Sequence, residues 1–156
     1  MIWWLWLGRI GGGLLGWFLV ELDRLLYVFW LRPEESLSEA VKSLWKGRRW
    51  WAAVKLIKSR RDEQQILVFR SSLAAVAFLP VALFGLTSSG GGLPEGLVIG
   101  FGWHLLVEFW QERKRNPQLL HYRLFWLIKR EVSGEEREWF LKLFSLAVGG
   151  LSLLLI

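Results

Sequence analysis

Residues 16–30 read GWFLVELDRLLYVFW, an apolar stretch with two acids and an arginine near its centre. Ionisable side chains are costly inside such hydrophobic segments, so they normally pair with one another and mark a functional place. Two later stretches, ILVFRSSLAAVAFLP at 66–80 and GFGWHLLVEFW at 100–110, have the same character. The polar positions are Glu21, Asp23 and Arg24 in the first stretch, Arg70 in the second, and His104 and Glu108 in the third. We therefore expect the chain to be organised around a cluster of these six residues.

The composition is typical of a membrane protein. The 156 residues are 53% apolar, with 12 Trp, 10 Phe and a mean hydropathy of +0.32. A water-soluble domain of this size would struggle to bury so many aromatic side chains, whereas membrane proteins place Trp at both interfaces. Cysteine is absent, which excludes disulfides, thiol nucleophiles and cysteine-based zinc sites.

The hydrophobic pattern predicts a single membrane domain over residues 1–156, all-α and polytopic, with four transmembrane helices and additional interfacial amphipathic helices. The first apolar stretch, 2–31, would form about 45 Å of helix, which exceeds a hydrocarbon core of ~30 Å. We expect the three glycines at 11–13 to break it. A span over 2–20, with the remainder lying on the membrane surface, is the alternative. The predicted spans are about 12–31, 66–86, 94–111 and 134–156.

Basic residues gather in two segments between these spans. Segment 32–65 carries nine Lys or Arg and segment 112–138 carries seven, whereas the connection 87–95 carries none. By the positive-inside rule both basic segments are predicted to be cytoplasmic, with both termini outside. Apolar residues recur at helical spacing within 36–61, which predicts two short amphipathic helices lying on anionic lipid headgroups. A solvated helical hairpin packed on its own domain is the alternative.

Local motifs predict where several helices begin. Three pairs have the spacing of an N-cap residue and its partner three positions later. These pairs are Ser36 with Glu39, Asp62 with Gln65, and Ser133 with Glu136. Pro94 suits the first turn of the third span, because that turn needs no backbone N–H from it.

The polar cluster allows two kinds of chemistry. His104 and Glu108, at positions i and i+4 of one helix, form a good pair of metal ligands. Asp23 or Glu21 could supply a third ligand. The alternative is a set of ion pairs between the two arginines and the acids. Arginines beside carboxylates compete with a divalent cation, and intramembrane charges normally pair with each other, so the spacing favours ion pairs.

At these residues the chain resembles a known family. Residues 16–30 are similar to the glycine-led Asp-x-Asp-His segment of the LexA-binding, inner-membrane-associated metal-dependent hydrolase-like family. FRSSLAAVAFLPVALF at 69–84 resembles that family's His-Ser helix start. GLVIGFGWHLLVEFW at 96–110 resembles its Gly-rich His-x-x-x-Asp helix.

The resemblance implies a membrane-bound, metal-dependent hydrolase of the bacterial inner membrane with six ligand positions. In this chain they fall on Glu21, Asp23, Arg24, Arg70, His104 and Glu108. Asp23 and His104 keep the family residue, and the two glutamates are conservative changes. Arg24 and Arg70 stand where the family has histidines, and arginine cannot ligate a metal. An arginine pair could instead clamp a lipid phosphate bidentately or neutralise the remaining acids.

Two functions follow from these patterns. The first is a non-catalytic protein with a structural ion-pair cluster and a basic cytoplasmic face that docks lipids or a partner. The second is a membrane-embedded hydrolase acting on a phosphate-bearing lipid or similar substrate. Its catalytic and metal-binding residues would be Asp23, His104 and Glu108, and its substrate-binding residues Arg24, Arg70 and Glu21.

The pattern favours the first function, for which no divalent metal is expected. Anionic lipid headgroups are the expected partners, and a protein partner or a second copy of the chain is left open. Nucleic acid is not expected, because hydrophobic segments flank the basic ones.

Overall fold

The computed structural model describes residues 2–88 and 91–154, and all regular secondary structure in these residues is helical. The chain divides into two units. Unit 1 consists of Met1–Val20 and Phe69–Ile156, and unit 2 consists of Glu21–Val68. The helical class predicted from the sequence is therefore confirmed for the described residues.

Helix α1 runs without interruption over Ile2–Leu26. The predicted break at the glycines 11–13 is therefore wrong. Gly12 instead allows a close contact with α5, which spans Leu93–Arg115. A Cβ atom on Gly12 would lie only 2.1 Å from the carbonyl oxygen of Leu93. Glycine is needed there because it lets two helix backbones approach.

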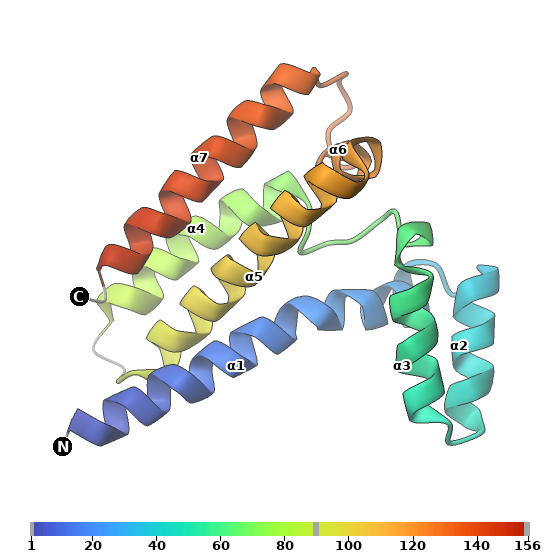
Figure 1. Cartoon of the computed structure of the whole chain (residues 1–156), viewed down its shortest axis with the longest axis horizontal. Coiled ribbons are helices and arrows are strands. Elements are labelled where there is room, and N and C mark those ends of the chain that lie inside the picture. The colour runs from blue at the N-terminus through green and yellow to red at the C-terminus, as the bar shows by residue number, and fades with distance from the viewer. Residues whose placement is uncertain (1, 89–90, 155–156) are drawn as a thin grey trace. The chain divides into compact units, whose positions relative to one another are not determined.

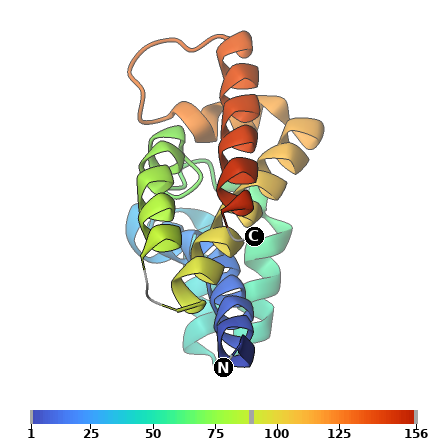
Figure 2. The same ribbon diagram turned by 90° about the vertical axis from the view of Figure 1, so that its left-hand side faces the viewer.

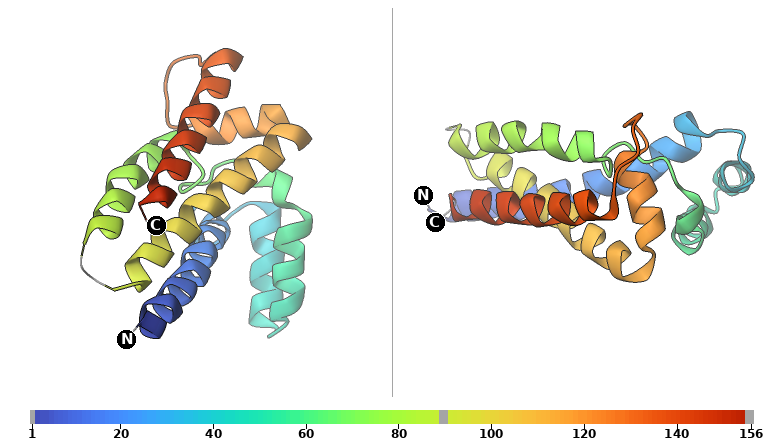
Figure 3. Two further views of the ribbon diagram at one scale, coloured as in Figure 1. Left: turned by 60° about the vertical axis from the view of Figure 1, so that its left-hand side comes forward. Right: turned by 90° about the horizontal axis from the view of Figure 1, so that it is seen from above.

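Unit 2 contains a helical hairpin. The elements of unit 2 are the end of α1, the π-helical turn η1 (Tyr27–Leu31), α2 (Ser36–Lys46), α3 (Trp50–Ser59) and the 3₁₀ turn η2 (Arg61–Glu63). Helices α2 and α3 form the hairpin. Helices α2 and α3 lie side by side and run in opposite directions (Figure 1 and Figure 3). Leu37 and Val41 of α2 and Ala53 and Ile57 of α3 are buried in a common core. Each pair is spaced i and i+4, so each helix presents one apolar stripe.

Two predicted N-caps in this region are wrong. Helix α2 begins at Ser36 itself, and its N-cap Glu35 makes no side-chain capping bond. The next long helix, α4, spans Ser72–Thr87 rather than beginning at 66. Its N-cap is Ser71, whose side chain accepts a hydrogen bond from the backbone N–H of Ala74 over 3.2 Å. Ser71 thus provides the cap that was expected from Asp62, which lies in η2.

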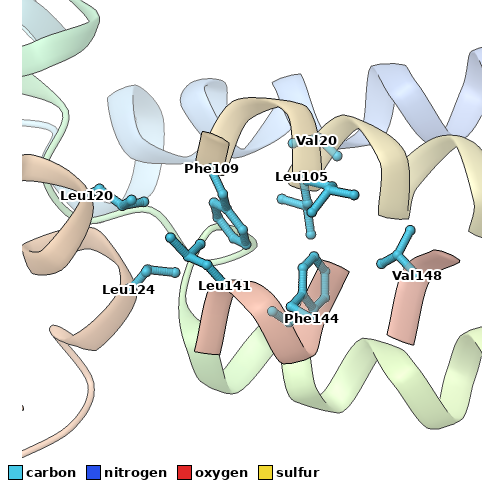
Figure 4. Close-up of a cluster of buried hydrophobic side chains, with 10 residues drawn as sticks. Val20, Leu105, Phe109, Leu120, Leu124, Leu141, Phe144 and Val148 are labelled. Atoms are coloured by element: carbon cyan, nitrogen blue, oxygen red, sulfur yellow. The ribbon is translucent and has the colours of Figure 1, made fainter. Parts of the chain in front are cut away.

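Unit 1 is built from the first part of α1 and four later helices. These are α4, α5, α6 (Pro117–Phe125) and α7 (Gly134–Leu153). Helices α4, α5 and α7 pack against one another (Figure 1 and Figure 2). Figure 4 shows Leu105 and Phe109 of α5 pointing towards Leu141 and Phe144 of α7. These buried side chains form the core of unit 1.

Two local predictions in unit 1 are confirmed. Ser133 and Glu136 form a reciprocal capping box at the start of α7. Pro94 lies in the first turn of α5. Both features depend only on residues within one helical turn, which is why the sequence predicts them.

Among residues 2–88 and 91–154, no helix is long and apolar enough to cross a membrane. The prediction of a polytopic protein with four transmembrane helices is therefore wrong. The 16 residues of α4 extend about 24 Å, less than a hydrocarbon core of ~30 Å. The longer helices carry charged side chains, including Arg9 in α1, Glu108 in α5 and Lys142 in α7. The predicted cytoplasmic and external segments required those spans.

Candidate functional site

Arg70 lies two residues before α4, is 1% exposed and makes one of the buried ion pairs of unit 1. Its Nε donates a hydrogen bond to the carboxylate of Glu108 in α5. Its Nη1 donates to the main-chain carbonyl of Val20 in α1 over 2.9 Å. A buried ion pair requires such additional hydrogen bonds, because desolvation of both charges is costly. Arg70 therefore joins three helices of unit 1 through polar contacts.

His104 lies one turn before Glu108 on the same face of α5. Its Nδ1 lies 2.7 Å from the main-chain oxygen of Trp17, and the rings of the two residues stack with centroids 4.3 Å apart. A carbonyl oxygen can only accept a hydrogen bond, so Nδ1 carries a proton. The opposite nitrogen, Nε2, lies 3.9 Å from Oε1 of Glu108. His104 is thus held in one orientation, with Nε2 directed towards the carboxylate.

The three predicted site residues of α1, which are Glu21, Asp23 and Arg24, belong to unit 2. Asp23 is fully buried, and its Oδ1 accepts a hydrogen bond from the backbone N–H of Val68 over 2.9 Å. This contact satisfies a main-chain donor in the non-helical segment after η2. Arg24 forms an ion pair with Glu21, with Nε and Oε2 separated by 3.3 Å. Within unit 2, Asp23 therefore connects α1 to the segment after η2, and Arg24 and Glu21 pair with each other on α1.

The six predicted site residues are divided equally between the two units. Unit 1 brings together Arg70, His104 and Glu108, and unit 2 holds Glu21, Asp23 and Arg24. The i and i+4 relationship of His104 and Glu108 is confirmed. That all six form one cluster stays a prediction.

The donor set of unit 1 does not fit a catalytic metal. A catalytic zinc site normally uses three protein ligands. His104 and Glu108 present neighbouring ligand atoms, and among the described residues of unit 1 no third His, Asp or Glu side chain joins them. Glu108 also accepts a hydrogen bond from Arg70, whose positive charge opposes a bound cation. The orientation of His104 through a backbone carbonyl resembles that of metal-bound histidines, but the same bond is explained by burial of the ring.

Sequence reasoning missed a second buried ion pair in unit 1. Arg123 of α6 is 1% exposed and donates to the carboxylate of Glu112 near the end of α5. Asn116 caps α6 by accepting a hydrogen bond from Leu119 N over 3.1 Å. The Asn-Pro sequence at 116–117 was the available signal, because it ends one helix, starts another and so reverses the chain.

Exposed cations of unit 2 lie at the turn between α2 and α3, with the sequence KGRRWW at 46–51. We call these six residues the basic tip. Arg48 has a positive φ of 55°, and its N–H donates to the carbonyl of Trp45 over 3.1 Å. Trp50 is 52% exposed and Trp51 is 89% exposed. Adjacent aromatic and cationic side chains thus project from an ordered turn.

Comparison of the chain with models of protein families, with curated protein sequences and with solved structures gave no match. The resemblance to metal-dependent hydrolases therefore stays a prediction that rests on the three motifs. The function has to be argued from the geometry of the described residues.

Proposed function

We propose that the protein is non-catalytic and binds anionic lipid headgroups through the basic tip of unit 2. In this proposal the charges around Arg70 only stabilise the fold of unit 1. The observation that carries it is the combination of exposed cations and exposed tryptophans on one ordered turn.

The ionisable residues around the tip all carry positive charge. Residues 40–61 contain eight Lys or Arg and no Asp or Glu. Lys46, Arg48 and Arg49 at the tip itself are all exposed. Near an anionic membrane surface each such cation contributes about 1 kcal/mol, and salt weakens the effect. Charge complementarity therefore favours an anionic partner at this position.

The two tryptophans favour a lipid surface over other anionic partners. Trp side chains have an apolar ring and a polar N–H, so they are stable at the boundary between headgroups and hydrocarbon. Trp51 leaves 89% of its surface in solvent, which offers apolar area for insertion. The turn is ordered before binding, because Arg49 N–H donates to the Leu44 carbonyl over 2.9 Å. Binding then costs little additional ordering of the backbone.

The test measures binding of the whole protein to vesicles. We expect binding to phosphatidylglycerol-containing vesicles at low salt, weaker binding at high salt, and little binding to pure phosphatidylcholine. The variant Arg48→Glu/Arg49→Glu should lose the binding. Trp51→Ala should weaken it without changing its salt dependence.

A charge-matched control separates the tip from the net charge of the chain. Lys114 and Lys129 are exposed cations of unit 1. The variant Lys114→Glu/Lys129→Glu changes the net charge by the same amount and should retain vesicle binding. Equal loss in both double variants, or equal binding to neutral vesicles, would contradict the proposal.

A further inference from the structure

Helices α1 and α5 of unit 1 are joined by a seam of glycines. A Cβ on Gly12 would lie 2.1 Å from the Leu93 carbonyl oxygen, and a Cβ on Gly16 would lie 2.0 Å from that of Leu97. No side chain fits at either position, so the two backbones are in direct contact. This seam leaves a groove along one side of the helix pair.

The groove has a volume of about 550 Å³, within the range of small-molecule sites. Its apolar lining includes Trp6, Trp17 and Trp103, together with Ile10, Leu14 and Ile99. Gly13, Gly96 and Gly100 also line it. A Cβ on Gly96 or Gly100 would lie only 2.0 or 2.2 Å from a backbone oxygen of α1, so these two glycines belong to the seam at the base of the groove. The size and lining favour a narrow hydrocarbon ligand.

The three tryptophans are held in place by contacts with neighbouring side chains. The indole N–H of Trp103 donates to Oγ of Ser152 over 3.0 Å. Trp17 stacks on His104, as described above. Trp6 lies beneath the guanidinium of Arg9, whose central carbon is 5.4 Å from the ring centroid. The walls are therefore formed before a ligand binds, which lowers the entropic cost of binding.

Arg9 is the charged residue in the lining of this groove. Its Nε donates to the carboxylate of Glu95 over 2.7 Å. Glu95 is not part of the lining, so it holds Arg9 from outside the groove. The terminal nitrogens of the guanidinium can still donate as a planar fork, which matches the geometry of a carboxylate.

We propose that this groove binds a long-chain fatty acid, with the hydrocarbon chain against the tryptophans and the carboxylate on Arg9. The apolar walls provide most of the affinity, and the single cation selects an anionic head at one end. The site lies in unit 1 and does not depend on lipid binding by the basic tip.

Two glycines of α1 provide a matched pair of variants. Gly13 lines the groove, and a Cβ added there would meet only the Gly96 oxygen, at an ordinary contact distance of 3.7 Å. Gly11 is not part of the lining, and a Cβ there would have nothing within 4 Å. Gly13→Leu should therefore fill the groove, whereas Gly11→Leu makes the same chemical change outside it.

The experiment measures quenching of tryptophan fluorescence in the whole protein by dibromostearic acid, with dibromostearyl alcohol as the head-group control. We expect saturable quenching that unlabelled palmitic acid reverses. Gly11→Leu should bind as the unmodified protein does, and Gly13→Leu should lose saturable binding. Arg9→Gln should weaken binding of the acid about tenfold and leave binding of the alcohol unchanged.

The proposal is overturned if Gly13→Leu binds dibromostearic acid as tightly as Gly11→Leu. Equal affinity of the unmodified protein for acid and alcohol would overturn the assignment of Arg9. Should Gly13→Leu fail to fold, a diazirine-bearing fatty acid and the unmodified protein provide a second test. Labelling confined to residues 6–17 and 96–103 supports the site, and labelling spread over the exposed faces of α4 and α7 contradicts it.

Discussion

Arg70 and the arginine pair at the basic tip show two opposite uses of the same side chain. Arg70 is buried and donates hydrogen bonds to Glu108 and to the Val20 carbonyl. Arg48 and Arg49 are exposed and stand next to exposed tryptophans. A buried charge must be neutralised by the fold, whereas an exposed one can be neutralised by a partner. Substitutions in the two regions should therefore separate stability from binding.

The largest effect on stability is expected for Arg70→Met. Removing one partner of a buried ion pair leaves the other charge desolvated and unpaired, at a cost of about 3–5 kcal/mol. The double variant Arg70→Met/Glu108→Gln should recover much of that loss. Chemical denaturation of the four proteins in a double-mutant cycle measures the coupling.

A surface ion pair of unit 1 provides the control for this cycle. Nε of Arg113 lies 2.8 Å from Oε2 of Glu138, and the two side chains are 37% and 28% exposed to solvent. Arg113→Met should cost no more than about 1 kcal/mol, because exposed ion pairs contribute little. Similar losses for Arg70→Met and Arg113→Met would show that Arg70 is not a structural charge.

The buried hydroxyl of unit 2 should give the next largest effect. Tyr27 is buried and donates a hydrogen bond to the carboxylate of Glu35. Hydrogen bonds to charged groups contribute about 1.5–3 kcal/mol, so Tyr27→Phe should lower the free energy of unfolding by that amount. Chemical denaturation at neutral pH measures it, and an unchanged midpoint would contradict the contact.

The same residue predicts the response of unit 2 to alkaline pH. Burial, followed by the hydrogen bond to Glu35, raises the pKa of Tyr27 well above its ordinary value near 10. A raised pKa means that the folded state favours the neutral phenol. Its contribution is complete below about pH 10 and is lost as the pH rises further. Tyr27→Phe should be less sensitive than the unmodified protein to alkaline denaturation above pH 10.

The capping box of α7 is intermediate between the buried ion pair of Arg70 and the exposed basic tip. Its side chains are exposed, but they form hydrogen bonds with the backbone at the start of the helix. The side chain of Ser133 accepts a hydrogen bond from Glu136 N over 3.1 Å. Ser133→Ala should therefore cost about 1 kcal/mol in thermal or chemical unfolding, as other N-cap losses do. Ser133→Asp is the conservative control and should retain most of the stability.

Acid should weaken this cap. A hydrogen bond from Arg130, followed by one from the Ser133 backbone, holds the pKa of Glu136 below its ordinary value. A lowered pKa means that the contribution is present above the ordinary value and is lost as the pH falls through the folded one. Titration of the Glu136 carboxyl by NMR checks the direction, and a value above that of a model peptide would contradict it.

The smallest effect on stability is expected at the basic tip. Arg48→Glu/Arg49→Glu should change the free energy of unfolding by about 0.5 kcal/mol or less, as for most exposed positions. The same variant should lose vesicle binding. Arg70→Met should show the reverse, with a large loss of stability and no direct effect on binding. A strongly destabilised tip variant would mean that these arginines support the hairpin rather than a partner.

Several elements could be predicted from short stretches of the sequence. The capping box at Ser133, Pro94 in the first turn of α5 and the shared face of His104 and Glu108 are all present. Each depends on groups within about one helical turn, whose geometry is fixed by the helix itself. The hairpin of α2 and α3 was recognised as two short helices for the same reason.

Other predictions failed because they required knowledge of neighbouring elements. The glycines at 11–13 were interpreted as a break, but Gly12 packs against the backbone of α5. The start of α4 was placed at 66, yet the capping bond is made by Ser71. The four spans were inferred from hydropathy. Hydropathy does not give the bounds of a helix, so it did not show that α4 has only 16 residues or that the longer helices include charged side chains.

The sequence by itself determined the helical class, the capping box at Ser133 and the two segments rich in Lys and Arg. It did so because the periodicity and the capping bonds are local properties of one helix. The tertiary structure alone decided that Arg70 pairs with Glu108, that Arg123 pairs with Glu112 and that the glycine seam leaves a groove beside Arg9. These features depend on which helix faces meet, and residues 11 to 86 positions apart in the chain must come together to form them.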